Sequence, residues 1–418
     1  MYDHREDQAM IADHDVLRML TGLLDDSHLA TLEQLPELVQ KHAALAGLDE
    51  VSVYLVDLQQ RVLRLVTGRG DDAHQEAGGP LAELRVEATL AGRAFQEVRV
   101  LPTPATEQGP AGWWVPLLDG TERLGLLRVT VADADEGVEE VMRHLASLVA
   151  LMLVSMRTHS DSYARLVRSQ PMHVAAEMQW QLTPPLTFAT EDVTIAAVME
   201  PAYEVGGDAY DYALAGDIAH LAVFDAMGHD VAAGLTANLA MAACRNHRRQ
   251  YMGLVANSEA IEHVLIEEFG RMPRYVTAIM AELNVRTGQL TWINRGHHPP
   301  VVIRGGRWAT VLECPPSHPL GLDLGLPITL CQEQLEPGDR VLFFTDGVIE
   351  AGGRIGGEFG LHRFIDFMIR HSSASLPVPE TLRRLVKSVM KYHQDQLDDD
   401  ATVLLTEWHG PAADRLRL

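Results

Sequence analysis

Two aspartates, Asp208 and Asp225, stand at the outer ends of two strand-like runs that a short turn joins. A glycine at the first position of a two-residue turn suits a type II′ hairpin, and Gly216 occupies that position here. In this register Ala215 pairs with Ile218, and counting outward sets Asp208 opposite Asp225. Directly opposed residues have Cβ atoms about 5 Å apart. The two carboxylates would therefore repel each other unless a cation lies between them.

Glycines surround both aspartates. Gly206 and Gly207 precede the first, and Gly228 follows the second. Residues without a Cβ let the backbone come close to a bound ion or ligand. We therefore expect these glycines to shape a binding site.

Further acidic residues end other apolar runs: Asp346 follows residues 340–344, and residues 402–408 are preceded by Asp398, Asp399 and Asp400. Taken singly, Asp346 could be a turn residue and the acidic run a solvated surface. Taken together, these acidic residues indicate a metal site, because carboxylates are hard oxygen ligands that suit Mg²⁺ or Mn²⁺. Two such ions can activate a water and neutralise a phosphate under attack. No HExxH, GxSxG or P-loop pattern competes with this interpretation.

The elements that must position these acids begin near residue 186. Alternating and apolar runs predict strands paired in hairpins, at residues 194–199, 210–213, 219–224, 278–285, 289–294, 301–303, 309–312, 328–335, 340–344 and 402–408. Helical periodicity predicts helices at residues 230–248, 258–270, 364–371 and 379–394, with Asp230 as the cap of the first. Hairpins with separate pairs of helices predict an α+β fold, in which helices cover antiparallel sheets.

The first part of the chain predicts a separate module. Helices are expected at residues 15–24, 28–46, 88–97 and from about 136, and strands at residues 51–56, 61–66, 114–118 and 124–131. This order resembles a GAF domain, a sensory α/β module, over residues 26–156, after an N-terminal helix in residues 1–25. A PAS-like module is the alternative. By resemblance the domain would either bind a small molecule or serve only in dimerisation and relay.

A helical linker is expected at residues 157–185. Positions from Leu145 to Gln170 alternate spacings of four and three, as in a two-stranded coiled coil. The alternative is a helix packed on its own sheet. Pro171 suits the first turn of a new helix, capped by Ser169 or Gln170. We therefore predict two helices with a hinge, and a homodimer formed through the GAF domain and the linker helices.

Composition limits the class of protein. The formal net charge of −24 over 418 residues argues against a general nucleic-acid or anionic-membrane binder. The longest apolar run, residues 145–154, is too short for a bilayer, which takes about 20 residues. The polar, acidic start does not resemble a signal peptide. Without CxxC spacing, Cys244, Cys314 and Cys331 are expected to be thiols in a reducing compartment. These features predict a cytoplasmic protein.

Several motifs together carry a family resemblance. VGGDAYD, FDAMGHD, NRGHHPP, HPLGL, LEPGDRVLFFTDGVIEA and DDDAT resemble, in order and spacing, the SpoIIE-like branch of the PPM metal-dependent serine/threonine protein phosphatases. The resemblance covers residues 172–408 and implies a PPM-type α-β-β-α sandwich at residues 186–410. It also implies a substrate, namely a phosphorylated STAS-type protein that antagonises an anti-sigma factor. The alternative function is a catalytically weak sensor or scaffold.

The resemblance assigns roles to individual residues. Asp225 would bridge two Mn²⁺ or Mg²⁺ ions, with the Ala226 carbonyl and Asp208 serving one of them. Asp346 and Asp399 would hold the other. Asp399 is preferred over Asp400 because it is the first aspartate of an Asp-Asp-x-Thr pattern. A bridging water would attack phosphorus in line, without a covalent enzyme intermediate.

This sequence departs from the family pattern at Asp230 and Ala209, where glycine and a bulkier aromatic are usual. No arginine adjoins the predicted metal-binding aspartates to clamp phosphate, so a protein substrate would need further docking. His297 and His298 in GHHPP are interpreted as structural residues, with His297 the better candidate for a chemical role.

Overall fold

The computed structural model describes residues 3–68, 82–105, 111–131, 137–270, 272, 274–349, 352–353, 357–358, 360–373, 376–392, 397 and 399–411. The chain divides into two compact units, Met1–Pro171 and Met172–Leu418. The predicted linker, residues 157–185, is therefore shared between them. Asp398 of the acidic run, and Glu350 in the motif LEPGDRVLFFTDGVIEA, lie outside the described residues.

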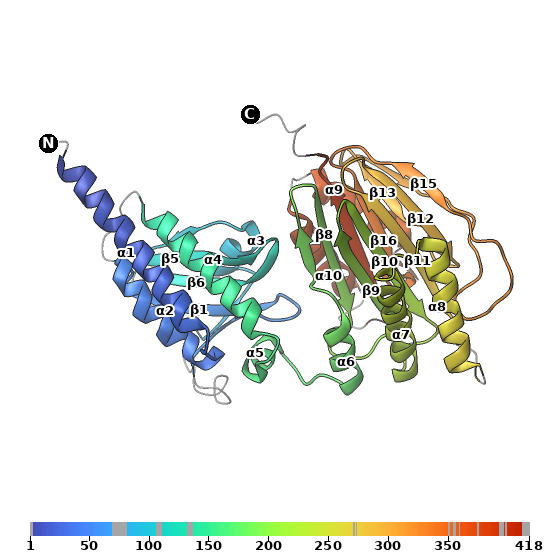
Figure 1. Ribbon diagram of the computed structural model, residues 1–418, viewed down its shortest axis with the longest axis horizontal. Coiled ribbons are helices and arrows are strands. Elements are labelled where there is room, and N and C mark those ends of the chain that lie inside the picture. Colours follow the sequence, from blue (N-terminus) through green and yellow to red (C-terminus); the bar gives the residue numbers. More distant parts are fainter. Residues whose placement is uncertain are drawn as a thin grey trace. The chain divides into compact units, whose positions relative to one another are not determined.

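The first unit is built on one antiparallel sheet (Figure 1), with the strand order β3-β2-β1-β6-β5-β4. Its strands are β1 (Glu50–Val56), β2 (Val62–Leu65), β3 (Glu83–Arg85), β4 (Leu101–Thr103), β5 (Gly112–Asp119) and β6 (Glu122–Thr130). One core joins this sheet to α1 (Asp3–Ser27), α2 (Leu35–Ala43), α4 (Val138–Met156) and α5 (Asp161–Val167). On a second core, α3 (Leu90–Glu97) packs over Tyr54 and Trp114. The GAF assignment stays a prediction.

The predicted coiled-coil seam is wrong, because the residues that would form it do not lie on one continuous helix. The helix α4 ends at Met156 and α5 begins at Asp161, where the Ser160 hydroxyl accepts from the backbone N of Tyr163. Leu145, Val149 and Met152 are buried in the core of the unit itself. The alternative, packing on its own sheet, is therefore correct. Heptad spacing did not distinguish them because the apolar stripe of any surface helix uses nearly the same positions.

The break at Pro171 is present, but the helix after it differs from the prediction. That helix, α6 (Val174–Leu182), begins later than expected, and its cap is His173, whose Nδ1 accepts from the backbone N of Ala175 at 3.2 Å. The predicted caps, Ser169 and Gln170, are wrong.

The second unit contains two large antiparallel sheets (Figure 1), in the orders β15-β12-β11-β10-β9 and β14-β13-β16-β19-β8-β7. The first sheet comprises β9 (Asp208–Ala215), β10 (Ile218–Ala226), β11 (Val276–Asn284), β12 (Gln289–Arg295) and β15 (Cys331–Gln334). The second comprises β7 (Thr187–Ala189), β8 (Val193–Glu200), β13 (Val301–Arg304), β14 (Trp308–Val311), β16 (Arg340–Phe344) and β19 (Ala401–Trp408). A small separate pair is formed by β17 (Gly352–Gly353) and β18 (Gly357–Glu358).

Three cores hold these layers together. Side chains from both sheets share the central core, which includes Tyr210, Leu221, Val341 and Leu404. The outer face of the first sheet packs on α7 (Val231–Arg248) and α8 (Leu254–Phe269). The outer face of the second packs on α9 (Gly360–Ser373) and α10 (Val378–Tyr392). This confirms the predicted α+β sandwich of antiparallel sheets covered by helices.

The interpretation of the cysteines as free thiols is wrong for two of them. Cys314 and Cys331 form a disulfide, with a Cα–Cα distance of 5.9 Å, and Cys244 is a buried thiol. Their spacing in the sequence carries no information about this distance, which the folding of the connecting loop onto the edge strand β15 determines. No helix in the described part of the chain has the length and apolar character that a membrane span requires.

Candidate metal and phosphate site

The predicted hairpin brings the two aspartates together between the sheets. Side chains of a strand alternate between its faces. On β10, Leu221 and Val223 face the central core, so Asp225 points toward the gap between the sheets. Asp208 pairs directly with Asp225, which confirms the predicted register. The turn residue Gly216 has a φ of +58°, as the first position of a type II′ turn requires.

A threonine of the second sheet holds Asp208. Thr345 directly follows β16, and its Oγ1 donates to Oδ2 of Asp208 at 2.7 Å. The hydroxyl oxygen of Thr345 also accepts from the backbone N of Thr402 at 2.9 Å. All three residues are buried. One carboxylate oxygen of Asp208 is therefore engaged by the protein, and the hairpin is tied to the opposite sheet.

The acidic run before β19 divides into an inner and an outer residue. Asp400 is buried, and its carboxylate accepts from the backbone N of Gly207. A Cβ on Gly206 would lie only 2.5 Å from Cγ of Asp400, so a side chain there would displace this carboxylate. Asp399 is exposed, and its Oδ1 accepts from the backbone N of Asp400 at 2.9 Å. Asp399 is thus the residue with a carboxylate open to a ligand.

The backbone beside Asp208 is packed too closely for a side chain. A Cβ on Gly207 would lie 2.3 Å from the carbonyl oxygen of Gly228 and 2.7 Å from that of Ala226. The N–H of Ala226 in turn donates to the carbonyl of Gly207 at 2.9 Å. Gly228 has a φ of +92°, which disfavours other residues. The predicted glycines and Ala226 therefore lie together in one close backbone crossing.

Burial and neighbouring carboxylates raise the pKa values of Asp208, Asp225 and Asp400. Burial is the main cause of the raised pKa of Asp208, followed by the charges of Asp225 and Asp400. Burial, then Asp346 and Asp399, raises the pKa of Asp225 to about 7. Burial likewise raises the pKa of Asp400 to about 7, although the N–H of Gly207 opposes this. The predicted acids thus form one electrostatically connected group.

This group suits a hard divalent cation in its chemistry. Its donors are carboxylate and carbonyl oxygens, which Mg²⁺ and Mn²⁺ prefer, and their mutual repulsion is the charge that a cation would offset. No set of three or more His, Cys, Asp or Glu side chains in the described ranges is arranged closely enough to hold an ion. The fit to a cation therefore rests on donor type and charge, and the described side chains do not form a preassembled ligand cluster.

The buried His297 does not have the environment of a general acid. Burial, followed by the charge of His298, lowers the pKa of His297 to about 4, so the ring is neutral at pH 7. Both ring nitrogens have protein neighbours: Oγ1 of Thr277 lies 2.7 Å from Nδ1, and the carbonyl oxygen of Phe344 lies 3.0 Å from Nε2. This geometry favours the structural interpretation.

Sequence reasoning missed three polar residues at this site, Thr277, Thr345 and Gln179. Gln179 lies on α6, and its Nε2 donates to the backbone carbonyl of Asp208. The threonines could have been found from strand alternation, because Thr277 on β11 and Thr345, just after β16, continue the series of side chains that point to the central core. No pattern in the sequence indicated Gln179.

The family model for stage II sporulation protein E (SpoIIE) matches residues 216–409. These residues form a SpoIIE domain. The resemblance predicted from the motifs is therefore confirmed for this part of the chain. The SpoIIE domain contains Asp225, Asp346 and Asp399, whereas Asp208 lies before its matched range.

Several curated proteins are similar to this chain. Protein IcfG of Synechocystis sp. (strain ATCC 27184 / PCC 6803 / Kazusa) is 23% identical over 221 residues, covering 46% of this chain and 34% of IcfG. This chain thus spans only about a third of that relative. The phosphoserine phosphatase RsbU of Bacillus subtilis (strain 168) is 22% identical over 276 residues, covering 64% of this chain and 80% of RsbU.

Solved structures give similar matches. The RsbU and RsbW domains of Rv1364c from Mycobacterium tuberculosis are 24% identical, with a TM-score of 0.49 and coverage of 56% of this chain and 64% of that one. The SiaA-PP2C domain of Pseudomonas aeruginosa is also 24% identical, with a TM-score of 0.48 and coverage of 56% and 94%.

Proposed function

We propose that the second unit is a metal-dependent phosphatase that removes phosphate from phosphoserine or phosphothreonine in a regulatory protein. The observation that carries this proposal is the convergence of Asp208, Asp225, Asp346, Asp399 and Asp400 at one edge of the gap between the sheets, where burial and the neighbouring charges raise the pKa values of Asp208, Asp225 and Asp400. The match of residues 216–409 to the SpoIIE family supports the same chemistry.

Within this proposal, the residues take distinct roles. Asp225 would bridge two cations, Mn²⁺ or Mg²⁺, and Asp346 and Asp399 would hold one of them. Asp208 has one oxygen engaged by Thr345, so it would give its other oxygen to the remaining cation, beside the Ala226 carbonyl. Asp400 would instead fix the Gly206–Gly207 backbone through its bond to the N–H of Gly207.

Bound divalent cations would activate a water molecule and neutralise the charge of the phosphate. The protein groups keep the carboxylates in place, and the tight contacts of Gly206 and Gly207 bring the backbone close to them. The substrate class follows from the similarity to RsbU, which is named a phosphoserine phosphatase. The substrate would be a phosphorylated STAS-type protein.

The first unit would then act as a regulatory module, with or without a small-molecule ligand, in a homodimeric cytoplasmic protein. Its connection to the site is α6, because Gln179 bonds to the backbone of Asp208. A shift of α6 would therefore reach a proposed metal ligand directly.

The test is release of phosphate from p-nitrophenyl phosphate and from a phosphorylated STAS protein, with Mn²⁺ and after its removal by a chelator. We expect metal-dependent turnover that Asp225→Ala abolishes. The matched control is Asp217→Ala, an exposed aspartate at the far end of the same hairpin, which should leave turnover unchanged. Failure of the wild type on both substrates would refute the phosphatase and favour a scaffold.

A further inference from the structure

The turn from Asn294 to His298 is held rigidly at the edge of the site. Nδ2 of Asn294 donates to the carbonyl of His297 at 2.9 Å, and the N–H of His297 donates back to Oδ1 of Asn294 at 2.8 Å. Gly296 has a φ of +70°, and a Cβ there would lie 2.9 Å from Cγ of Pro319. The backbone that carries His297 therefore has little freedom.

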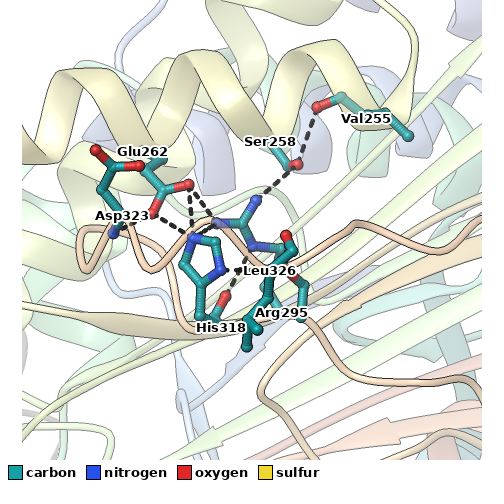
Figure 2. A network of polar contacts seen from close by, with 8 residues as sticks. Val255, Ser258, Glu262, Arg295, His318, Asp323 and Leu326 are labelled. Carbon is teal, nitrogen blue, oxygen red and sulfur yellow. Dashed lines mark hydrogen bonds and ion pairs between the residues drawn. The ribbon is translucent and has the colours of Figure 1, made fainter.

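A buried ion pair anchors the same turn to α8. Figure 2 shows Arg295, which is fully buried, pointing at Glu262 of α8 and at His318. The guanidinium donates from Nε to the carbonyl of His318 at 2.9 Å, and Oε1 of Glu262 accepts from the N–H of Asp323 at 2.9 Å. Because each buried charge has a partner, this network fixes the turn without an unpaired charge.

The imidazole of His297 has its proton placed by its neighbours. A backbone carbonyl can only accept, so the carbonyl of Phe344, 3.0 Å from Nε2, requires the proton on Nε2. The other nitrogen, Nδ1, is then an acceptor, and the hydroxyl of Thr277 lies 2.7 Å from it. His297 thus joins β11 to the end of β16, two residues before Asp346.

This arrangement decides where the Thr277 hydroxyl points. Oγ1 of Thr277 also lies 3.4 Å from Oδ2 of Asp225, to which it is paired across the strands. The hydroxyl carries one proton, and the shorter contact with Nδ1 of His297 takes it. Asp225 then faces a lone pair of Thr277, in contrast to Asp208, which accepts the proton of Thr345 at 2.7 Å.

We propose that His297 is a positioning residue that turns the Thr277 hydroxyl away from Asp225, and so keeps both oxygens of Asp225 free for divalent cations. This inference rests on the metal site of the proposed function. It adds to that site a residue with no contact to the cation, acting through Thr277.

Two substitutions of His297 separate the two hydrogen bonds of its imidazole, because each keeps one bond and removes the other. In His297→Asn the amide oxygen can take the place of Nδ1 and accept from Thr277, whereas the bond to Phe344 is lost. In His297→Gln the amide nitrogen can take the place of Nε2 and donate to Phe344, whereas the acceptor for Thr277 is lost. Each variant removes one hydrogen bond, so a purely structural role predicts similar losses in both.

The experiment is calorimetric titration of Mn²⁺ into the full chain, with thermal unfolding of each variant as a check on folding. We expect His297→Gln to weaken Mn²⁺ binding at least about tenfold, because the Thr277 hydroxyl is then free to donate to Asp225, and changes beside a metal ligand usually have effects of this size. His297→Asn should bind close to the wild type. Adding Thr277→Val to His297→Gln should restore binding, because the misdirected hydroxyl is then gone.

Equal weakening by Asn and Gln would overturn the positioning role, as would a double variant that binds no better than His297→Gln alone. The neighbouring change His298→Gln is the control and should leave Mn²⁺ binding unchanged. A wild type that binds Mn²⁺ but releases no phosphate would refute the phosphatase only, and the affinity comparison would still decide the role of His297. A wild type that binds neither Mn²⁺ nor Mg²⁺ would refute both.

Discussion

Replacing Asp225 by asparagine should stabilise the metal-free protein, although Asp225 is the residue on which metal binding is proposed to depend most. Burial and the charges of Asp346 and Asp399 raise its pKa to about 7. Its charged carboxylate is therefore unfavourable at pH 8 in the absence of a cation. The neutral amide of the substituted side chain keeps the size of the carboxylate and removes the charge.

The size and the sign of this effect follow from the pKa. A change in pKa from the ordinary aspartate value of 3.8 to about 7 corresponds, at about 1.4 kcal/mol for each unit, to an upper limit of about 4 kcal/mol. Between these values the folded protein holds a proton that the unfolded chain has lost. The stability of the metal-free protein therefore falls as pH rises from about 4 to about 7, and is lowest above pH 7.

The assay is urea unfolding of the full chain at pH 8 and at pH 5, with chelator and with Mn²⁺. Without metal, Asp225→Asn should be more stable than the wild type at pH 8, and the difference should shrink at pH 5. With Mn²⁺ at about 100 times its Kd, the wild type should gain about 2.7 kcal/mol and the variant much less. Asp217→Asn, exposed at the far end of the hairpin, is the control. A metal-free variant no more stable than the wild type at pH 8 would refute the electrostatic reasoning.

Other parts of the second unit give further predictions. Gly206→Ala should lower turnover about 10- to 100-fold in a p-nitrophenyl phosphate assay, because its Cβ would displace Asp400, whereas unchanged turnover would contradict this packing. Gln179→Leu should reduce Mn²⁺ affinity in calorimetry, since the Asp208 backbone loses its donor on α6; equal affinity would show that α6 does not act on the site. Cys314→Ser should lower the free energy of unfolding by about 3 kcal/mol in urea, and the loss should vanish when the wild type is compared under reducing conditions.

The hairpin was predictable because two local signals agree there. A turn glycine sets the register, and strand alternation then places Asp208 opposite Asp225 without any tertiary information. The sandwich was predictable for a similar reason, since paired strands and amphipathic helices have few ways to bury their apolar faces. In contrast, the disulfide between Cys314 and Cys331 depends on the path of a loop, which no local signal describes.

The sequence distinguished the roles of Asp399 and Asp400 only through a family pattern. In the structure the division has a physical origin. Strand β19 begins at Ala401, and on it Thr402 and Leu404 face the space between the sheets. Asp400, two residues before Thr402, continues inward to the N–H of Gly207, and Asp399 points out. Strand alternation therefore turns Asp400 inward, where it holds the backbone, and leaves the carboxylate of Asp399 free to bind a ligand.

At this site, uncharged hydrogen-bond donors keep negatively charged carboxylates close to one another. Asp208 is tied to Thr345 of the other sheet, and Asp400 to the backbone of Gly207, although the pKa values of both carboxyls are raised by burial and by neighbouring charges. Hydrogen bonds of this kind keep the oxygens in place before any cation arrives, which is the preorganisation that a binding site requires. Asp225 differs because the only hydroxyl near it among the described contacts is directed to His297. An acid that is held near other acids, and whose nearest described hydroxyl lies 3.4 Å away and is directed to another acceptor, has most to gain from a cation.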